Sequence, residues 1–296
     1  SPTGLFVRIL DQPAATADLM ISSSVNEKSA PALITFPDGG ALLSFRGRNA
    51  DNLRDVFTTQ RTPAGWNEPR SLNSDLWRSQ ESPTSAPRLA SDGPRVSAAW
   101  FTAADNQPRV LLSTSADAGE HFLLPMKVDL GRAFGPVDTV LLHDGAALAI
   151  WMEGPSEELR THPGGVWIRR ASPQSNLDGP ILVATKDTIS ATRPRAVLLQ
   201  DYSETNPEAR LLIAYSGADG LHTLLVTVPE AALLAAATES CGCGGAPAQL
   251  TGFPFRGTLV QALPIEGVLI VKHPDLPGLL LAGTHRFRAE PGVLAS

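Results

Sequence analysis

The sequence predicts an all-β fold of repeated four-stranded antiparallel units, and three observations lead to this class. The apolar segments are short and rich in Val, Leu, Ile, Phe and Trp, which is typical of strands. Asp-Gly, Gly-Gly and proline-glycine signals separate them at the spacing of hairpins. The pattern also recurs about every 45 to 55 residues, a period at which arrays of small sheets are expected.

Four such units follow one another along the chain. Each has the order strand, turn, strand, polar loop, strand, turn and fourth strand. They begin at PALITFPDGG, APRLASDGP, GPVDTVLLHDG and TRPRAVLLQDY. Small sheets repeated around an axis are the blades of a β-propeller, and we expect five or six blades. Residues 5–24 are expected to pair with C-terminal strands; a β-sandwich with similar turns is the alternative fold.

Composition and charge narrow the function classes. The chain has 296 residues, of which 43% are hydrophobic and 18% charged, so a folded protein with one main domain is expected. Its net charge of -6 is spread without a basic stripe, which argues against nucleic acid as a partner. No apolar run approaches the ~20 residues of a membrane span. We expect a monomer, periplasmic or secreted, whose signal peptide has been removed.

The C-terminal third departs from the strand rhythm. Residues 229–240, PEAALLAAATES, predict one short helix, because Ala and Leu favour helices and Pro229 suits a helix start. We therefore expect a propeller over residues 1–236, a Cys/Gly-rich linker over 237–254, and a β-strand tail over 255–296. Whether the tail completes the propeller is left open.

The stretch STSADAGEHF lies between the third and fourth strands of the second unit. Ser115, Asp117, Gly119 and Phe122 match the Asp-box pattern, S/T-x-D-x-G-x-x-W/F, and the chain resembles bacterial sialidase-like (BNR) propellers over about residues 31–230. In such a turn the carboxylate accepts bonds from backbone N–H groups, glycine adopts a positive φ, and the aromatic ring packs between blades. The motif predicts a structural turn.

The resemblance to sialidases implies a carboxylate sugar held by three arginines, an Asp acid/base and a Tyr nucleophile activated by a Glu. The segment FVRIL around Arg8 departs from the F/Y-R-I-P motif of that family. The candidates for these roles are Arg8, Arg46, Arg48, Asp51, Asp55, Arg193, Arg195, Tyr202 and Tyr215. Two functions stay open: a non-catalytic cell-envelope protein that binds a small molecule, carbohydrate or protein at the propeller axis, and an exo-α-sialidase.

The tail resembles the first half of small periplasmic copper-binding proteins of the CusF-like type, on the frame Gly257, Gly267, His273, Pro277-Gly278, Thr284 and Phe287. Where that family has methionines, this chain has Leu280, Gly283 and His285. The candidate metal ligands are Cys241, Cys243, His273 and His285. Thiolate and imidazole groups suit Cu(I) or Zn(II), so copper is the one cofactor hypothesis. The alternative is that these are ordinary strand and linker residues.

Overall fold

The structure is a computed structural model of the whole chain. It describes residues 4–8, 18–155, 164–185, 193–201, 208–217, 220–229, 258–263, 268–273 and 283–288. The chain divides into two compact units, the first made of Ser1–Glu157 with His162–Ala231, the second of Glu158–Thr161 with Ala232–Ser296. Within the described residues, no helix has the length and hydropathy of a membrane-spanning segment.

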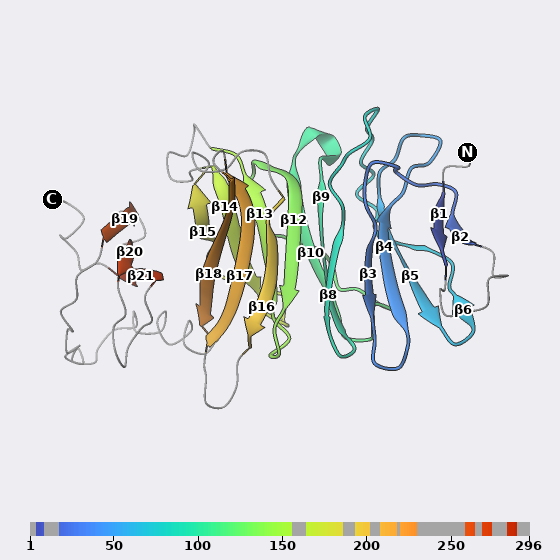
Figure 1. The fold of residues 1–296 in the computed structure, drawn as a ribbon. Helices are drawn as coiled ribbons and strands as arrows, with labels where there is room; N and C mark the ends of the chain where they lie inside the picture. The colour runs from blue at the N-terminus through green and yellow to red at the C-terminus, as the bar shows by residue number, and fades with distance from the viewer. Residues whose placement is uncertain are drawn as a thin grey trace. The chain divides into compact units, whose positions relative to one another are not determined.

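The described residues of the first unit form five antiparallel sheets, which stand side by side in chain order (Figure 1). The N-terminal sheet pairs β1 (Leu5–Val7) with β2 (Leu19–Ser22). The second sheet is formed by β3 (Ala32–Thr35), β4 (Ala41–Arg46), β5 (Val56–Thr62), β6 (Gly65–Trp66) and β7 (Arg70–Asn73). The third is formed by β8 (Arg88–Asp92), β9 (Arg95–Thr102), β10 (Arg109–Ser115) and β11 (Met126–Lys127), with the 3-10 turn η1 (Ala104–Asn106) between β9 and β10.

The fourth sheet follows the same meander through β12 (Ala133–Leu141), β13 (Ala147–Glu153), β14 (Gly165–Ala171) and β15 (Ile181–Thr185). The fifth has three strands, β16 (Arg195–Gln200), β17 (Glu208–Gly217) and β18 (Gly220–Pro229). The second unit, described by itself, contains one sheet of β19 (Thr258–Leu263), β20 (Val268–His273) and β21 (Gly283–Arg288).

The Asp-Gly signals mark the first hairpin of successive sheets. Gly39, Gly93 and Gly145 all have a positive φ, which glycine adopts without a steric penalty. The carboxylates of Asp38 and Asp144 accept a bond from the backbone N–H two residues later, at 2.8 Å in each case. These local bonds explain why strand ends could be placed from the sequence.

Apolar side chains fill the spaces between neighbouring sheets. Along β13 successive side chains point to opposite faces. Leu148, Ile150 and Met152 join a core cluster with strands of the fifth sheet, whereas Ala149 and Trp151 join a cluster with strands of the third. A smaller cluster links the second sheet to the third. The third and fourth sheets are therefore each packed between two neighbours, as blades are.

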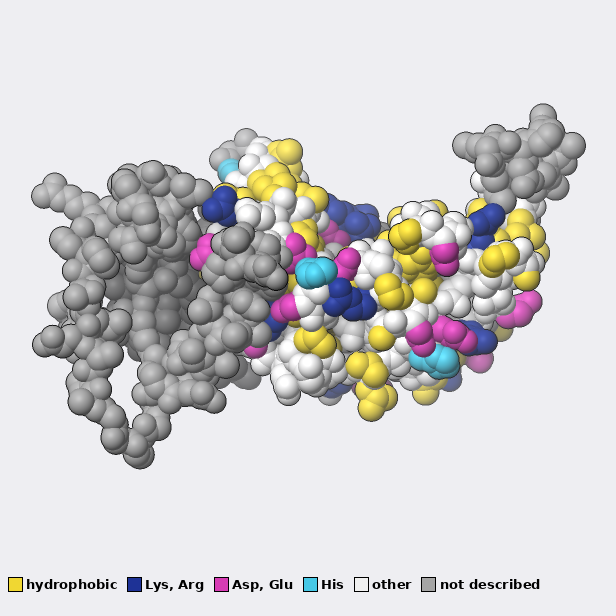
Figure 2. Space-filling view, turned by 90° about the horizontal axis from the view of Figure 1, so that it is seen from below, with side chains coloured by type: hydrophobic (Ala, Val, Ile, Leu, Met, Phe, Trp, Pro, Cys, Tyr) yellow, Lys and Arg dark blue, Asp and Glu magenta, His cyan; other side chains and the backbone are white. Residues whose placement is uncertain are grey.

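The first strands of successive sheets also adjoin one another, since β12 contacts both β8 and β16, and β3 contacts β8. We call β3, β8, β12 and β16 the inner strands. On the face drawn in Figure 2, basic and acidic side chains are interspersed.

These observations confirm the predicted all-β class with repeated antiparallel sheets, which are four-stranded in the third and fourth sheets. The expected pairing of residues 5–24 with C-terminal strands is wrong for the described strands, because β1 and β2 pair with each other. The helix expected at 229–240 lies outside the described residues, apart from Pro229, which ends β18.

Candidate functional site

Charged side chains gather where the inner strands begin. A proline stands at the start of each regular inner-strand ladder: Pro31, Pro87, Pro136 and Pro194. Proline has no N–H to donate, so it suits the first position of a strand. The residues that follow include Arg88 on β8, Asp138 on β12 and Arg195 on β16.

Asp138 is buried and links three sheets. Its Oδ1 accepts a bond from Arg88 Nε at 3.0 Å, and its Oδ2 accepts one from the Ala196 backbone N–H at 2.9 Å. Arg195 Nη1 donates to the Pro194 carbonyl oxygen at 3.0 Å. Burial lowers the pKa of Arg195, as does repulsion by Arg88 and Arg193, while Asp138 opposes the shift.

We name Arg88, Arg193 and Arg195 the arginine trio. Arg88 binds the Asp138 carboxylate, and Arg195 interacts electrostatically with Asp138, Arg88 and Arg193. The three side chains are accessible to different degrees: Arg193 is exposed, Arg195 is half-buried, and Arg88 is 30% exposed. Guanidinium groups bind carboxylates and phosphates through planar, charge-assisted bonds. The start of the inner strands can therefore accept an anion.

Arg46, a predicted sugar ligand at the end of β4, is 1% exposed. Its Nη1 and Nη2 donate to the carbonyl oxygens of Arg54 and Phe101, both at 2.6 Å, and its guanidinium lies 5.0 Å from the centre of the Trp77 ring. Burial lowers the pKa of Arg46 to about 10, although Asp75 and Asp55 favour the charged form. Arg46 thus joins two sheets from within the core and does not present its charge to a ligand.

Asp55, the predicted acid, forms a carboxyl pair with Asp75. Burial raises the pKa of Asp55 to about 6, reinforced by a hydrogen bond and charge repulsion from Asp75, while the backbone N–H groups of Leu76 and Trp77 oppose the shift. Leu76 N donates to Asp55 Oδ1 at 3.1 Å. Two neighbouring carboxyl groups share a proton more easily than they carry two negative charges.

The carboxyl pair predicts a specific pH dependence. Because the folded pKa of Asp55 lies above its ordinary value of 3.8, the folded state holds this proton more tightly than the unfolded chain does. The stabilisation is complete below about pH 4 and is lost as the pH rises through about 6. Asp55→Asn removes this titration and keeps the acceptor for Leu76. We expect the melting temperature of the variant, relative to the native chain, to rise between pH 4 and pH 7; a constant difference would contradict the assignment.

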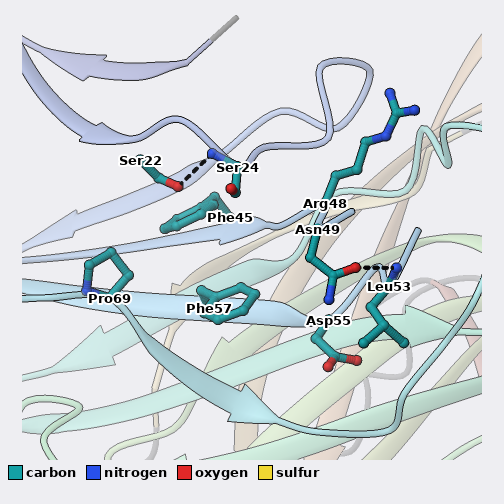
Figure 3. A pocket seen from close by; sticks show the side chains of 9 residues that line it. All are labelled: Ser22, Ser24, Phe45, Arg48, Asn49, Leu53, Asp55, Phe57 and Pro69. Carbon is teal, nitrogen blue, oxygen red and sulfur yellow. Dashed lines mark hydrogen bonds between the residues drawn. The ribbon is translucent and has the colours of Figure 1, made fainter. Parts of the chain in front are cut away.

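A cavity of about 130 Å³ lies beside this pair, between β2 and the ends of β4 and β5 (Figure 3). The stacked rings of Phe45 and Phe57, 5.8 Å apart, form one wall. Arg48 and Asp55, two predicted site residues, both line it, but Figure 3 shows the Arg48 guanidinium pointing away from the Asp55 carboxyl. The cavity thus brings these two candidates to one place without aligning their charged groups.

The Asp-box forms a tight turn after β10. Ser115 Oγ donates to Asp117 Oδ1 at 2.7 Å, and the backbone N–H of His121 donates to the same oxygen at 2.9 Å. Burial alone would raise the pKa of Asp117, but the bonds from His121 and Ser115 lower it to about 2. Gly119 has a φ of 86°, and Phe122 packs against the cluster between the second and third sheets.

Replacing Asp117 by alanine is expected to lower the free energy of unfolding by about 1–3 kcal/mol, because the turn loses the acceptor of its N–H groups. Urea unfolding measures this loss. Asp51→Ala, at an exposed aspartate, is the control and should change stability by less than about 0.5 kcal/mol. If Asp117→Ala instead leaves unfolding unchanged and abolishes ligand binding, the turn is functional rather than structural.

The remaining sialidase candidates lie in separate places. Arg8 follows β1 and is paired with Asp18 at 2.7 Å on an exposed surface. Tyr215, on β17, stacks on the His222 ring with centroids 5.4 Å apart and packs against the core of the fourth and fifth sheets. Asp51 is exposed, and Tyr202 lies outside the described residues. The structure therefore distributes Arg8, Arg46 and Tyr215 over three different sheets.

Of the predicted metal ligands, Cys241 and Cys243 lie outside the described residues. His273 and His285 fall on the neighbouring strands β20 and β21, where His273 pairs with Gly283 and His285 with Val271. The two histidines are therefore diagonal neighbours in one ladder.

Besides Asp138, the sequence analysis missed two further buried carboxylates, Glu153 and Asp129. Glu153, 1% exposed, accepts bonds from Leu130 N at 3.1 Å and from Trp151 Nε1 at 2.6 Å. Burial raises the pKa of Glu153, against these bonds. Asp129 accepts a bond from Val110 N at 2.8 Å. Through these hydrogen bonds both carboxylates fix the segment between β11 and β12. The signal that could have identified Glu153 is an acidic residue within an apolar strand, as in ALAIWME.

Comparison with known proteins gives likeness of fold alone. No family model matches the sequence, and no curated protein does so. Among solved structures, a protein of unknown function from Dyadobacter fermentans matches at 14% identity and a TM-score of 0.44, over 66% of this chain and 59% of that one. The Hadza microbial sialidase Hz136 matches at 14% identity and 0.43, over 73% and 49%.

The Trypanosoma rangeli sialidase matches at 12% identity and a TM-score of 0.40, over 77% of this chain and 40% of that one. The chain spans less than two thirds of the length of each of these three structures. The likeness of the C-terminal segment to copper-binding proteins finds no support in these comparisons.

Proposed function

We propose that the protein is a non-catalytic binding protein, periplasmic or secreted, whose inner strands hold a small acidic ligand such as a carboxylated sugar. The observation that carries the proposal is the arginine trio, in which Arg195 interacts electrostatically with Arg88, Arg193 and the carboxylate of Asp138. Arg88 donates to Asp138 through Nε, so this bond does not use either of its terminal amino groups. Asp138 thereby orients Arg88, as a positioning residue.

The proposal predicts selective binding of acids. Isothermal titration calorimetry with N-acetylneuraminic acid and glucuronic acid should detect binding that weakens as salt is added, and glucose should bind at least tenfold more weakly. Arg195→Gln should lower the affinity for the acids about tenfold, because a charged hydrogen bond contributes about 1.5–3 kcal/mol. Arg109→Gln, on β10, is the matched control and should bind as the native chain does. Equal affinity for glucose and the acids would reject the proposal.

The dispersal of the catalytic candidates supports binding without hydrolysis. An exo-α-sialidase, the alternative function, needs its arginines, acid and tyrosine around one sugar, whereas Arg46 is enclosed in the core and Tyr215 is stacked on His222. We therefore expect no turnover of a fluorogenic sialoside above the uncatalysed rate. Turnover that Asp55→Asn abolishes would favour the enzyme.

A link to copper is a second part of the proposal. The adjacency of His273 and His285 in the β20–β21 ladder supports it, as does the Cys-x-Cys sequence of Cys241 and Cys243. Titration of Cu(I) against a competing chelator should show weak binding of about one ion, since four such ligands complete one coordination shell. Binding that is equal in the double Cys→Ser variant would remove copper from the proposal.

A further inference from the structure

A groove of about 290 Å³ lies beside the Asp-box turn, between the second and third sheets. We propose that it is a separate binding site for a neutral monosaccharide, distinct from the arginine trio. Its polar lining residues come from β5, the segment around β7 and the Asp-box turn: Thr58, Gln60, Asn67, Arg70, Glu120 and His121.

Strand alternation explains how β5 presents polar groups to this groove. Phe57 lines the cavity of Figure 3 on one face of the sheet. Val56, on the other face, packs against the third sheet. Thr58 and Gln60 share the face of Val56, and Thr58 is 7% exposed. Thr58 therefore contributes a largely buried side chain with a hydroxyl group to the lining of the groove.

A hydrogen bond between Gln60 and Ala118 joins the two sides of the groove and also orients the Gln60 side-chain amide. Gln60 Nε2 donates to the carbonyl oxygen of Ala118 at 2.9 Å, which fixes the amide and leaves Oε1 as an acceptor. In the Asp-box turn, His121 Nδ1 lies 2.8 Å from Asp117 Oδ2, so the Asp-box carboxylate fixes the imidazole and leaves Nε2 for a ligand. The turn therefore positions groove residues as well as closing a hairpin.

The charges of the lining disfavour an acidic ligand. The lining contains two carboxylates, those of Glu68 and Glu120, and one guanidinium, that of Arg70. Hydroxyl, amide and charged groups provide both donors and acceptors, which is what a sugar hydroxyl requires. The ring of Phe122 lines the same groove and offers an apolar surface to sugar C–H groups.

The size of the groove agrees with one sugar ring. A water molecule occupies about 30 Å³ in the liquid, so the groove of about 290 Å³ has the volume of roughly ten waters. Bonded heavy atoms pack more closely than separate waters do, so the groove has room for one hexopyranose ring.

Saturation-transfer NMR tests the proposal with the methyl glycosides of glucose, galactose, mannose and N-acetylglucosamine. We expect ring-proton signals from at least one of them, with the affinity then measured by titration. Thr58→Val keeps the shape of the side chain and removes its hydroxyl, and Glu120→Gln removes one charge at the exposed rim. Each should weaken binding about five- to tenfold, the loss expected for one hydrogen bond.

The arms of the experiment separate this site from the arginine trio. Arg195→Gln should leave binding of the methyl glycoside unchanged while it weakens binding of the acids. The proposal would be overturned if none of the four glycosides gave a signal at a ligand concentration of about 20 mM, because a dissociation constant above this value corresponds to only a very weak interaction. Binding that survives both groove variants and is lost in Arg195→Gln would also overturn it. Thermal melts of each variant show whether a loss of binding reflects unfolding.

Discussion

Arg46→Met is expected to lower the free energy of unfolding by about 3–5 kcal/mol at pH 7.5, the cost of removing one partner from a buried charged network. Methionine keeps the length of the side chain but leaves the carbonyl oxygens of Arg54 and Phe101 without the donors they have in the structure. It also removes the cation that faces Asp55 and Asp75. Urea unfolding at constant m-value measures the loss.

The same variant should be less harmful in acid. Below about pH 6 the carboxyl pair carries a proton, since the pKa of Asp55 is raised to about 6, and the missing cation then leaves less uncompensated charge. We expect the destabilisation to be smaller at pH 5 than at pH 7.5. Arg109→Met, on β10, is the control at both pH values. An effect of Arg46→Met that does not change with pH would mean that only the hydrogen bonds to carbonyl oxygens matter.

Gly119→Ala is expected to destabilise the protein by about 2–5 kcal/mol, from two causes that add. A φ of 86° is unfavourable for alanine, at about 1–2 kcal/mol. A Cβ at this position would also lie 2.6 Å from Leu42 Cδ2 of the second sheet, and such overpacking costs about 1–3 kcal/mol. The variant should therefore loosen the contact between the second and third sheets.

Gly179→Ala is the matched control, because its φ is not positive and a Cβ there would meet no atom within 4 Å. It should change stability by less than about 1 kcal/mol, in the stabilising direction if at all. If both glycine variants unfold alike, the strain and the clash at Gly119 are unimportant. Thermal unfolding of the two variants side by side makes the comparison direct.

The parts of the fold that could be predicted from the sequence are those that depend on near neighbours. In the turns at Gly39 and Gly145, the preceding aspartate accepts a bond from the backbone N–H two residues after it, so the Asp-Gly signal contains the necessary information. The Asp-box is equally local, because Ser115, Asp117 and His121 lie within seven residues. The sheets that these turns connect followed from the same signals.

The candidate sites depend on residues far apart in the sequence, and the prediction failed or remained incomplete there. Arg88 meets Asp138 across 50 positions, and Ala196 meets Asp138 across 58. Such contacts exist only because neighbouring inner strands adjoin, which no local pattern encodes. Arg195 was identified as a candidate, but Arg88 and Asp138 were not. Arg46 was interpreted as a residue that binds a sugar. Its burial against the third sheet is also a long-range property, which the local sequence does not show.

The position of β13 has a consequence for how the first unit opens. All seven of its residues are buried, and both its edges are paired, with β12 and β14. Because its two faces belong to different core clusters, neither cluster can lose its packing while β13 stays in place for the other. The third, fourth and fifth sheets therefore form one cooperative block, in which the amide protons of β13 exchange with solvent only through an opening that involves all three.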